Sequence, residues 1–174
     1  MTTNVWIERV MKIVPTFMGV YSADNILLPA KFPSSCIVNL STQYEKGTHF
    51  VSILYPNSET CIYFDPLDLG YIPKNIFDYL RKQLNRNIII INFQIQNMFS
   101  IFCGLYCMLL SLLQLHKYPI YDTIQQNFKE GSELNDDKCI RMLRRLIILT
   151  HFTHGTNVVF DEGLEKDNRL QKSI

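Results

Sequence analysis

The sequence lacks an apolar run long enough to cross a bilayer. Its longest apolar stretch extends from Ile101 to Leu115 and is interrupted by Gly104, Ser111 and Gln114. A transmembrane helix needs about 20 predominantly apolar residues. We therefore expect this stretch to be a buried core helix, and we expect no contact with a membrane.

A secretory leader and an even set of cysteines are also missing. Residues 1–15 carry Glu8, Arg9 and Lys12 among their apolar residues, which is unlike the apolar centre of a signal peptide. The five cysteines are odd in number and irregularly spaced, whereas small secreted domains usually pair even sets in disulfides. We expect free thiols in a reducing compartment and a protein that is not secreted.

The chain has little net charge, no internal repeat and no low-complexity tract. A net charge of +1 favours no class of partner. With 47% hydrophobic and 19% charged residues, the composition is typical of a globular protein. A chain of 174 residues suits one domain with a sizeable core. We expect a single domain over residues 1–160 and a charged, flexible tail over 161–174.

The spacing of apolar residues predicts several helices. Helical spacing appears over 4–14, over 75–84 with Asn75 as a cap, and over 136–150. A further, almost wholly apolar helix is expected to begin near Cys103. These helices are separated by segments with the properties of strands.

Runs of β-branched and aromatic residues predict the strands. The runs at 49–55 and 60–64 flank a turn signal, Pro-Asn-Ser-Glu, and together predict a β-hairpin. The near-continuous run at 87–95 predicts a buried central strand. Residues 22–35, with two prolines, predict a loop. The sequence therefore indicates an α+β domain.

Cys103 stands at the beginning of the predicted apolar helix. A thiol attacks a carbonyl only as the thiolate, which the positive end of a helix or a neighbouring histidine favours. The next residue, Gly104, has no Cβ and allows a substrate backbone to approach. Cys107, one turn deeper, should be buried and inert. The pattern is typical of a nucleophile, although a single cysteine at a helix start is more often a small core residue.

His49 is the histidine best placed to activate this thiol. It begins the first strand of the predicted hairpin, and Asp65 ends the partner strand. Antiparallel neighbours place these two ends side by side, and a carboxylate beside an imidazole fixes its tautomer. The other histidines lie at the far end of the apolar helix or in a loop beyond the last helix: His116, His151 and His154.

Two glutamines precede the nucleophile and are candidates for an oxyanion-hole amide. Gln94 and Gln96 are two residues apart, so on an extended chain their side chains point the same way. We favour Gln96, because it lies nearer the loop that turns into the helix. We expect the backbone of Gln94 to be held in the strand ladder.

The order His49, Asp65, Gln96, Cys103 resembles that of the adenovirus maturation protease family (adenain) and its relatives in large mobile DNA elements. Further stretches resemble that family in the same order: 17–24, 36–39, 47–69 and 96–107. More distantly, the same order of residues is found in the SUMO and ubiquitin-like proteases.

The resemblance implies an α+β, papain-like cysteine protease fold with permuted chain order, in which a central mixed β-sheet is packed by a buried helix that carries the nucleophile. By position, His49 corresponds to the general base, Asp65 to the orienting acid, Gln96 to the oxyanion-hole amide and Cys103 to the nucleophile. The chain departs from the family at Phe50, where tryptophan is usual. It also carries aspartate at 65, where the adenovirus enzyme has glutamate.

The function implied is a cysteine endopeptidase that processes viral or mobile-element precursor proteins, such as capsid and core proteins, after small glycine-containing motifs. Such a protein would be a monomer in the virion or the infected cell. Two alternatives stay open. One is a protease that removes ubiquitin or SUMO from Gly-Gly tails, and the other is a catalytically silent interaction module.

The resemblance also implies an activating peptide and stimulation by DNA, while the sequence requires no cofactor. Two basic clusters are candidate contacts to phosphates, although each is also typical of an ordinary solvated face. The larger comprises Lys138, Arg141, Arg144 and Arg145, and the smaller Arg81, Lys82 and Arg86. No pair of Cys and His residues has the spacing of a zinc site, so we expect no metal.

Overall fold

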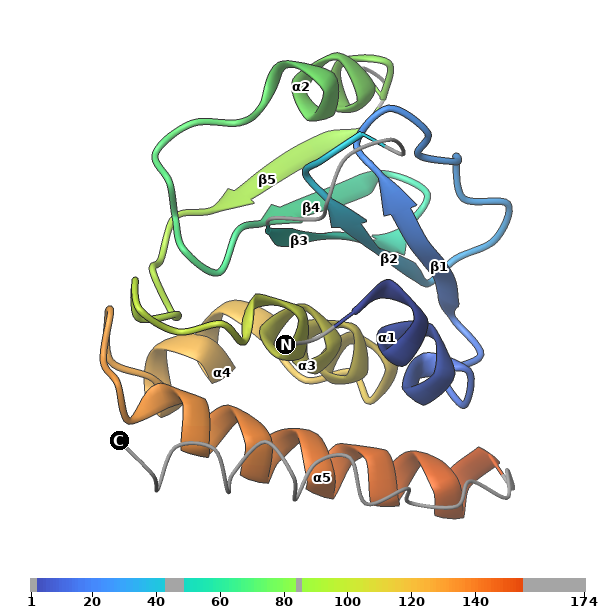
Figure 1. Cartoon of the computed structure of the whole chain (residues 1–174). Helices are drawn as coiled ribbons and strands as arrows, with labels where there is room; N and C mark the ends of the chain where they lie inside the picture. Colours follow the sequence, from blue (N-terminus) through green and yellow to red (C-terminus); the bar gives the residue numbers. More distant parts are fainter. Residues whose placement is uncertain (1–2, 43–48, 84–85, 155–174) are drawn as a thin grey trace.

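The computed structural model describes residues 3–42, 49–83 and 86–154 (Figure 1). The expected tail over 161–174, and with it the domain boundary at 160, lies outside these residues. Within them the chain forms the following elements in order: α1 (Asn4–Met11), β1 (Phe17–Ser22), β2 (Ser34–Asn39), β3 (Phe50–Asn57), β4 (Thr60–Phe64), α2 (Lys74–Arg81), β5 (Asn87–Ile91), α3 (Cys103–Leu115), α4 (Ile120–Asn127) and α5 (Asn135–His154).

The five strands form one mixed sheet in the order β1-β2-β3-β4-β5. The outer pairs, β1 with β2 and β4 with β5, are parallel, and the inner pairs are antiparallel. The predicted hairpin is confirmed as β3 and β4, in which Ser52 lies opposite Phe64. The predicted α+β class, with a mixed sheet, is therefore confirmed.

The position predicted for the strand at 87–95 is wrong. β5 ends at Ile91 and lies at the edge of the sheet, where β4 is its neighbour. Ile89 and Ile90 are 42% and 45% exposed. A continuous β-branched run indicates that a strand is apolar on both faces, but it does not say how many neighbours the strand has.

Helices cover both faces of the sheet and create two cores. Figure 1 shows α2 above the sheet and α1, α3, α4 and α5 below it. The core under α2 includes Ile76, Leu80 and the sheet residue Tyr63. The larger core surrounds α3, which is buried on all sides from Cys103 to Gln114. An apolar helix of this kind is stable only inside a protein, and here it lies between the sheet and α5.

Three helices differ from the sequence-based expectation. α2 begins at Lys74, after Pro73, so Asn75 lies inside the helix and does not cap it. α4 was not predicted, because Ile124 is its one fully buried residue and its pattern is mostly polar. α5 continues to His154, since the sequence has no glycine or proline between Asn135 and His154. No helix in the described ranges is both long and apolar enough to span a membrane.

Candidate active site

The hairpin joins His49 to Asp65. His49 directly precedes β3, and its carbonyl accepts a hydrogen bond from the N–H of Leu40, at 2.9 Å. Asp65 directly follows β4. The imidazole Nε2 lies 2.6 Å from the carboxylate Oδ1, and both side chains are buried. The adjacency expected from the hairpin is therefore found.

The turn after β4 fixes the carboxylate of Asp65. The N–H of Leu67 donates to Oδ1 at 2.9 Å, and the N–H of Leu69 donates to Oδ2 at 3.4 Å. Aspartate side chains commonly bond the backbone of the turn that they begin. Because backbone donors hold both of its oxygens, the carboxylate of Asp65 has one orientation. In this orientation Oδ1 faces Nε2 of His49.

The second partner of His49 is Cys103, whose side chain lies close enough to the imidazole to raise the pKa of the ring. Since Nε2 is bonded to Asp65, the nitrogen left for the sulfur is Nδ1. Burial by itself would lower the pKa of His49. The hydrogen bonds to Asp65 and Cys103, together with the charges of both residues, outweigh burial and raise this pKa from 6.5 to about 9. At neutral pH the ring therefore carries a positive charge beside the sulfur.

Cys103 is the first residue of α3 and is 8% exposed. Its N–H and that of Gly104 meet no acceptor among the described residues, as expected at a helix N-terminus. These donors and the helix dipole favour a negative charge at this point. The thiol thus stands between an imidazolium and a set of open backbone donors.

Two hydrogen bonds of Cys107 fix the position of α3 against β3. The hydroxyl of Ser52, on β3, donates to the carbonyl of Cys107 at 3.3 Å, and the Cys107 thiol donates to the carbonyl of Phe50 at 3.4 Å. Cys107 is fully buried, and burial raises its pKa well above the usual value. The prediction that Cys107 is buried is confirmed, and its contacts place the beginning of α3 against His49.

Gln96 lies in the segment between β5 and α3. Its N–H donates to the carbonyl of Pro66 at 2.8 Å, which joins this segment to the residue after Asp65. Its side-chain Nε2 donates to the carbonyl of Ser100 at 2.6 Å, while the buried Oε1 has no partner among the described residues. Because an amide nitrogen carries two hydrogens, one donor of Gln96 is not used by this bond.

The reason given against Gln94 is wrong, because β5 ends at Ile91 and Gln94 lies outside the ladder. Its backbone is nevertheless held, since its carbonyl accepts from the N–H of Gly131 at 2.8 Å. Its side chain donates to the carbonyl of Gln96 at 3.1 Å. Gln94 therefore supports the segment that carries Gln96.

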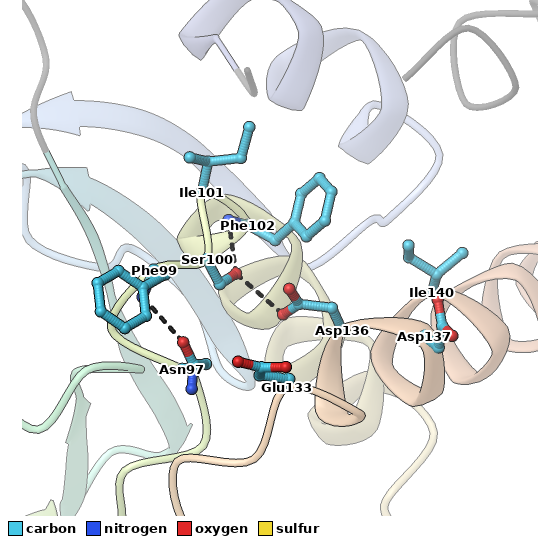
Figure 2. Close-up of a pocket in the computed structure, with 9 residues that line it drawn as sticks. All are labelled: Asn97, Phe99, Ser100, Ile101, Phe102, Glu133, Asp136, Asp137 and Ile140. Atoms are coloured by element: carbon cyan, nitrogen blue, oxygen red, sulfur yellow. Dashed lines mark hydrogen bonds between the residues drawn. The ribbon is translucent and has the colours of Figure 1, made fainter. Parts of the chain in front are cut away.

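Sequence reasoning missed a polar network that holds the loop before Cys103. Oδ1 of Asp136, at the beginning of α5, accepts from the hydroxyl of Ser100 at 2.9 Å and from that of Tyr106 at 2.6 Å. The Ser100 hydroxyl also accepts from the N–H of Phe102, at 3.2 Å (Figure 2). No spacing signal links residues so far apart in the chain, so a single sequence could not reveal this network.

The remaining histidines do not reach the thiol. His116, at the far end of α3, bonds Thr150 of α5 at 2.9 Å. His151 and His154 lie in the last turn of α5, where a loop was expected. In the part of the chain that the structure describes, no group of three His, Cys, Asp or Glu residues is arranged to hold a metal ion.

The two basic clusters differ in their surroundings. The larger cluster lies on α5, where Arg141 and Arg145 are exposed, Lys138 and Arg144 are half-buried, and Lys138 lies over the ring of Phe128. In the smaller cluster, Arg86 packs against the rings of Phe32 and Tyr55 and donates to the carbonyl of Ser58. Arg86 is therefore engaged within the fold.

Comparisons with known proteins find matches only among solved structures. No protein-family model matches the chain, and no curated protein matches it. Among solved structures, the chain is similar to the crystal structure of the ASFV pS273R protease, with a TM-score of 0.47 and 14% sequence identity. The similarity covers 72% of this chain and 44% of that protease, so the chain spans less than half the length of the protein that it matches.

Proposed function

We propose that the protein is a cysteine endopeptidase in which Cys103 is the nucleophile, His49 the acid and base, Asp65 the orienting acid and Gln96 an oxyanion donor. The observation that carries this proposal is the continuous path from the Asp65 carboxylate through the His49 ring to the Cys103 sulfur, at the beginning of a buried helix. Each of these residues comes from a different part of the fold, and packing holds all of them.

The geometry supports the following reaction. The sulfur of Cys103, as the thiolate paired with the His49 imidazolium, attacks the carbonyl carbon of a peptide bond. The oxygen then becomes negative and accepts hydrogen bonds from the backbone N–H of Cys103 and from the free amide hydrogen of Gln96. His49 gives its proton to the departing nitrogen, the C–N bond breaks, and a thioester forms with Cys103.

Water completes the cycle. The neutral ring of His49 takes a proton from a water molecule, which attacks the thioester carbonyl. The C–S bond breaks, a carboxylic acid leaves, and the thiolate–imidazolium pair is restored. Asp65 accepts the Nε2–H of the ring, as the carboxylate does in related triads.

We propose precursor proteins of a virus or mobile element, cleaved after small glycine-containing motifs, as the substrates. The support is the resemblance of residues 17–24, 36–39, 47–69 and 96–107 to the adenovirus protease family, and it extends to action in the virion or the infected cell. By the same resemblance, DNA is a candidate activator at the four basic residues of α5. A peptide activator is a candidate as well.

The proposal is tested by incubating the purified chain with the precursor proteins encoded beside its gene and sequencing the new N-termini. A peptide probe with a thiol-reactive end, applied in parallel, should label Cys103. Cys103→Ala is the blank, and Cys61→Ala, which removes a buried thiol under α2, is the matched control. Cleavage of a ubiquitin-like fusion alone would favour the deconjugating alternative, and a lack of labelling would favour the silent module.

A further inference from the structure

A cleft of about 410 Å³ opens directly beside the loop that leads to Cys103. Asn97 and residues 99–102 form one wall, and Glu133 with the beginning of α5 forms the other (Figure 2). Phe102, which lines the cleft, is the residue before Cys103. The cleft therefore begins one residue before Cys103 along the chain, while its lining includes neither Cys103 nor His49.

The cleft is acidic. Its lining includes the carboxylates of Glu133, Asp136 and Asp137, and it includes no Lys, Arg or His. Asp136 holds the loop through Ser100 and Tyr106. Glu133 and Asp137 are exposed and bond no other described residue. Two carboxylates thus face the cleft with no basic residue in its lining, and one of them, Asp137, also lies in the first turn of α5, where a negative charge suits the helix dipole.

Apolar side chains surround the same cleft and are exposed. Phe99 is 92% exposed and Ile101 is 56% exposed, and both line the cleft. Met98, the neighbour of Phe99, is 73% exposed. A contiguous apolar surface beside polar groups is typical of a site that contacts another molecule. The loop therefore offers an apolar surface next to a negative one.

The distance between Cys103 and the cleft determines which residues of a bound substrate would lie in the cleft. Consecutive Cα atoms are 3.8 Å apart, so residues 100–102 lie within about 11 Å of Cys103 along the chain. An extended peptide advances about 3.3 Å per residue. A substrate whose reacting carbonyl lies at Cys103 therefore reaches the cleft within about four residues.

From these observations we infer that the cleft is a specificity site for a basic side chain of the substrate. A lysine or arginine within about four residues of the cleaved bond enters between Glu133 and Asp137, and an adjacent apolar residue packs on Phe99. This inference rests on the proposed protease function and names a feature of its substrates. Partly exposed charge pairs are modest in strength, so we expect a preference of about five- to tenfold.

The test uses short peptides that contain Gly-Gly, in which a Leu-Lys pair is moved along the chain one position at a time. A matching series carries norleucine, which keeps the four-carbon side chain without the ammonium group. Cleavage is measured as kcat/KM with the wild-type chain and with the double variant Glu133→Gln, Asp137→Asn. Asp122→Asn, which changes an exposed carboxylate of α4 outside the cleft, is the matched control. Binding of the same peptides to Cys103→Ala is measured by fluorescence anisotropy.

We expect one position at which lysine exceeds norleucine about five- to tenfold in kcat/KM and in affinity. The double variant should lose this preference, the control should keep it, and added salt should weaken it. Equal values for lysine and norleucine at every position, or a preference that survives in the double variant, would overturn the inference. If no peptide is cleaved but lysine peptides still bind through Glu133 and Asp137, the protease proposal fails, and the cleft remains a binding site for basic side chains without being a substrate specificity site.

Discussion

The pairing of His49 with Asp65 makes a prediction that can be worked out in numbers. Asp65→Asn keeps the shape of the side chain and removes its charge, so the interactions that oppose burial are weakened. Without the carboxylate, only the interactions with Cys103 oppose burial, and the pKa of His49 should fall well below about 9. At pH 7 a ring with a pKa of about 9 is about 99% charged, whereas a fall to the ordinary value of 6.5 would leave about 25% charged.

The assay is a pH titration followed by NMR on the Cε1–H resonance of His49. The chain has four histidines, so the four signals can be assigned by single substitution. Asp68→Asn is the matched control. Asp68 lies in the same turn, does not bond His49, and has a positive φ of 45° that asparagine also tolerates. A midpoint near 9 that is unchanged in Asp65→Asn would refute the assigned cause.

The same titration predicts how stability depends on pH. Because the folded state holds the His49 proton more tightly than the unfolded chain, this proton stabilises the fold fully below about pH 6.5. The contribution is lost as the pH rises to about 9. Its size is on the order of 3 kcal/mol. Thermal unfolding of the wild-type chain should therefore shift downward over this range, and Asp65→Asn should lose most of this dependence.

Three further predictions concern activity and stability. Cys103→Ala should abolish cleavage while the melting temperature stays close to that of the wild-type chain. His49→Ala should lose as much cleavage activity as Cys103→Ala, and Asp65→Ala should lose less. Peptide cleavage by the Cys103→Ala chain would contradict the assignment of Cys103 as the nucleophile. Gln96→Ala should lower kcat on the order of 10²–10³-fold, with little change in KM, and a simple alkylating agent should still react with Cys103. If Gln94→Ala shows this pattern and Gln96→Ala behaves like the wild-type chain, the oxyanion donor is Gln94. Tyr106→Phe should lower the free energy of unfolding by about 1–3 kcal/mol, because the carboxylate of Asp136 loses a buried hydrogen-bond donor. Denaturant unfolding measures this change, and an unchanged denaturation midpoint would show that the bond from Tyr106 to Asp136 does not stabilise the fold.

Local pattern was sufficient for the hairpin and for α3. β-Branched and aromatic runs predicted β3 and β4, and their antiparallel pairing placed His49 beside Asp65. The apolar run predicted a buried helix, and its first residues predicted where Cys103 would lie. These are features that depend on neighbours in sequence, and sequence patterns describe such features well.

The features that sequence reasoning missed depend on which elements meet in space. The edge position of β5 is decided by sheet order, which the composition of the strand does not encode. The contact of Asp136 with Ser100 joins residues 36 positions apart, and the packing of Arg86 on Phe32 joins residues that lie even further apart along the chain. Such long-range contacts leave no period in the sequence.

The bond from Ser52 to the Cys107 carbonyl has a consequence for folding. It closes a loop of 55 residues, and contacts at such separation form only after much chain entropy has been lost. The hairpin can bring His49 to Asp65 early, because these residues are 16 apart, whereas the thiol joins them only when α3 has docked. A partly folded or nascent chain thus holds Cys103 away from His49, and under the proposed function peptide cleavage would be a direct readout of the fully folded protein.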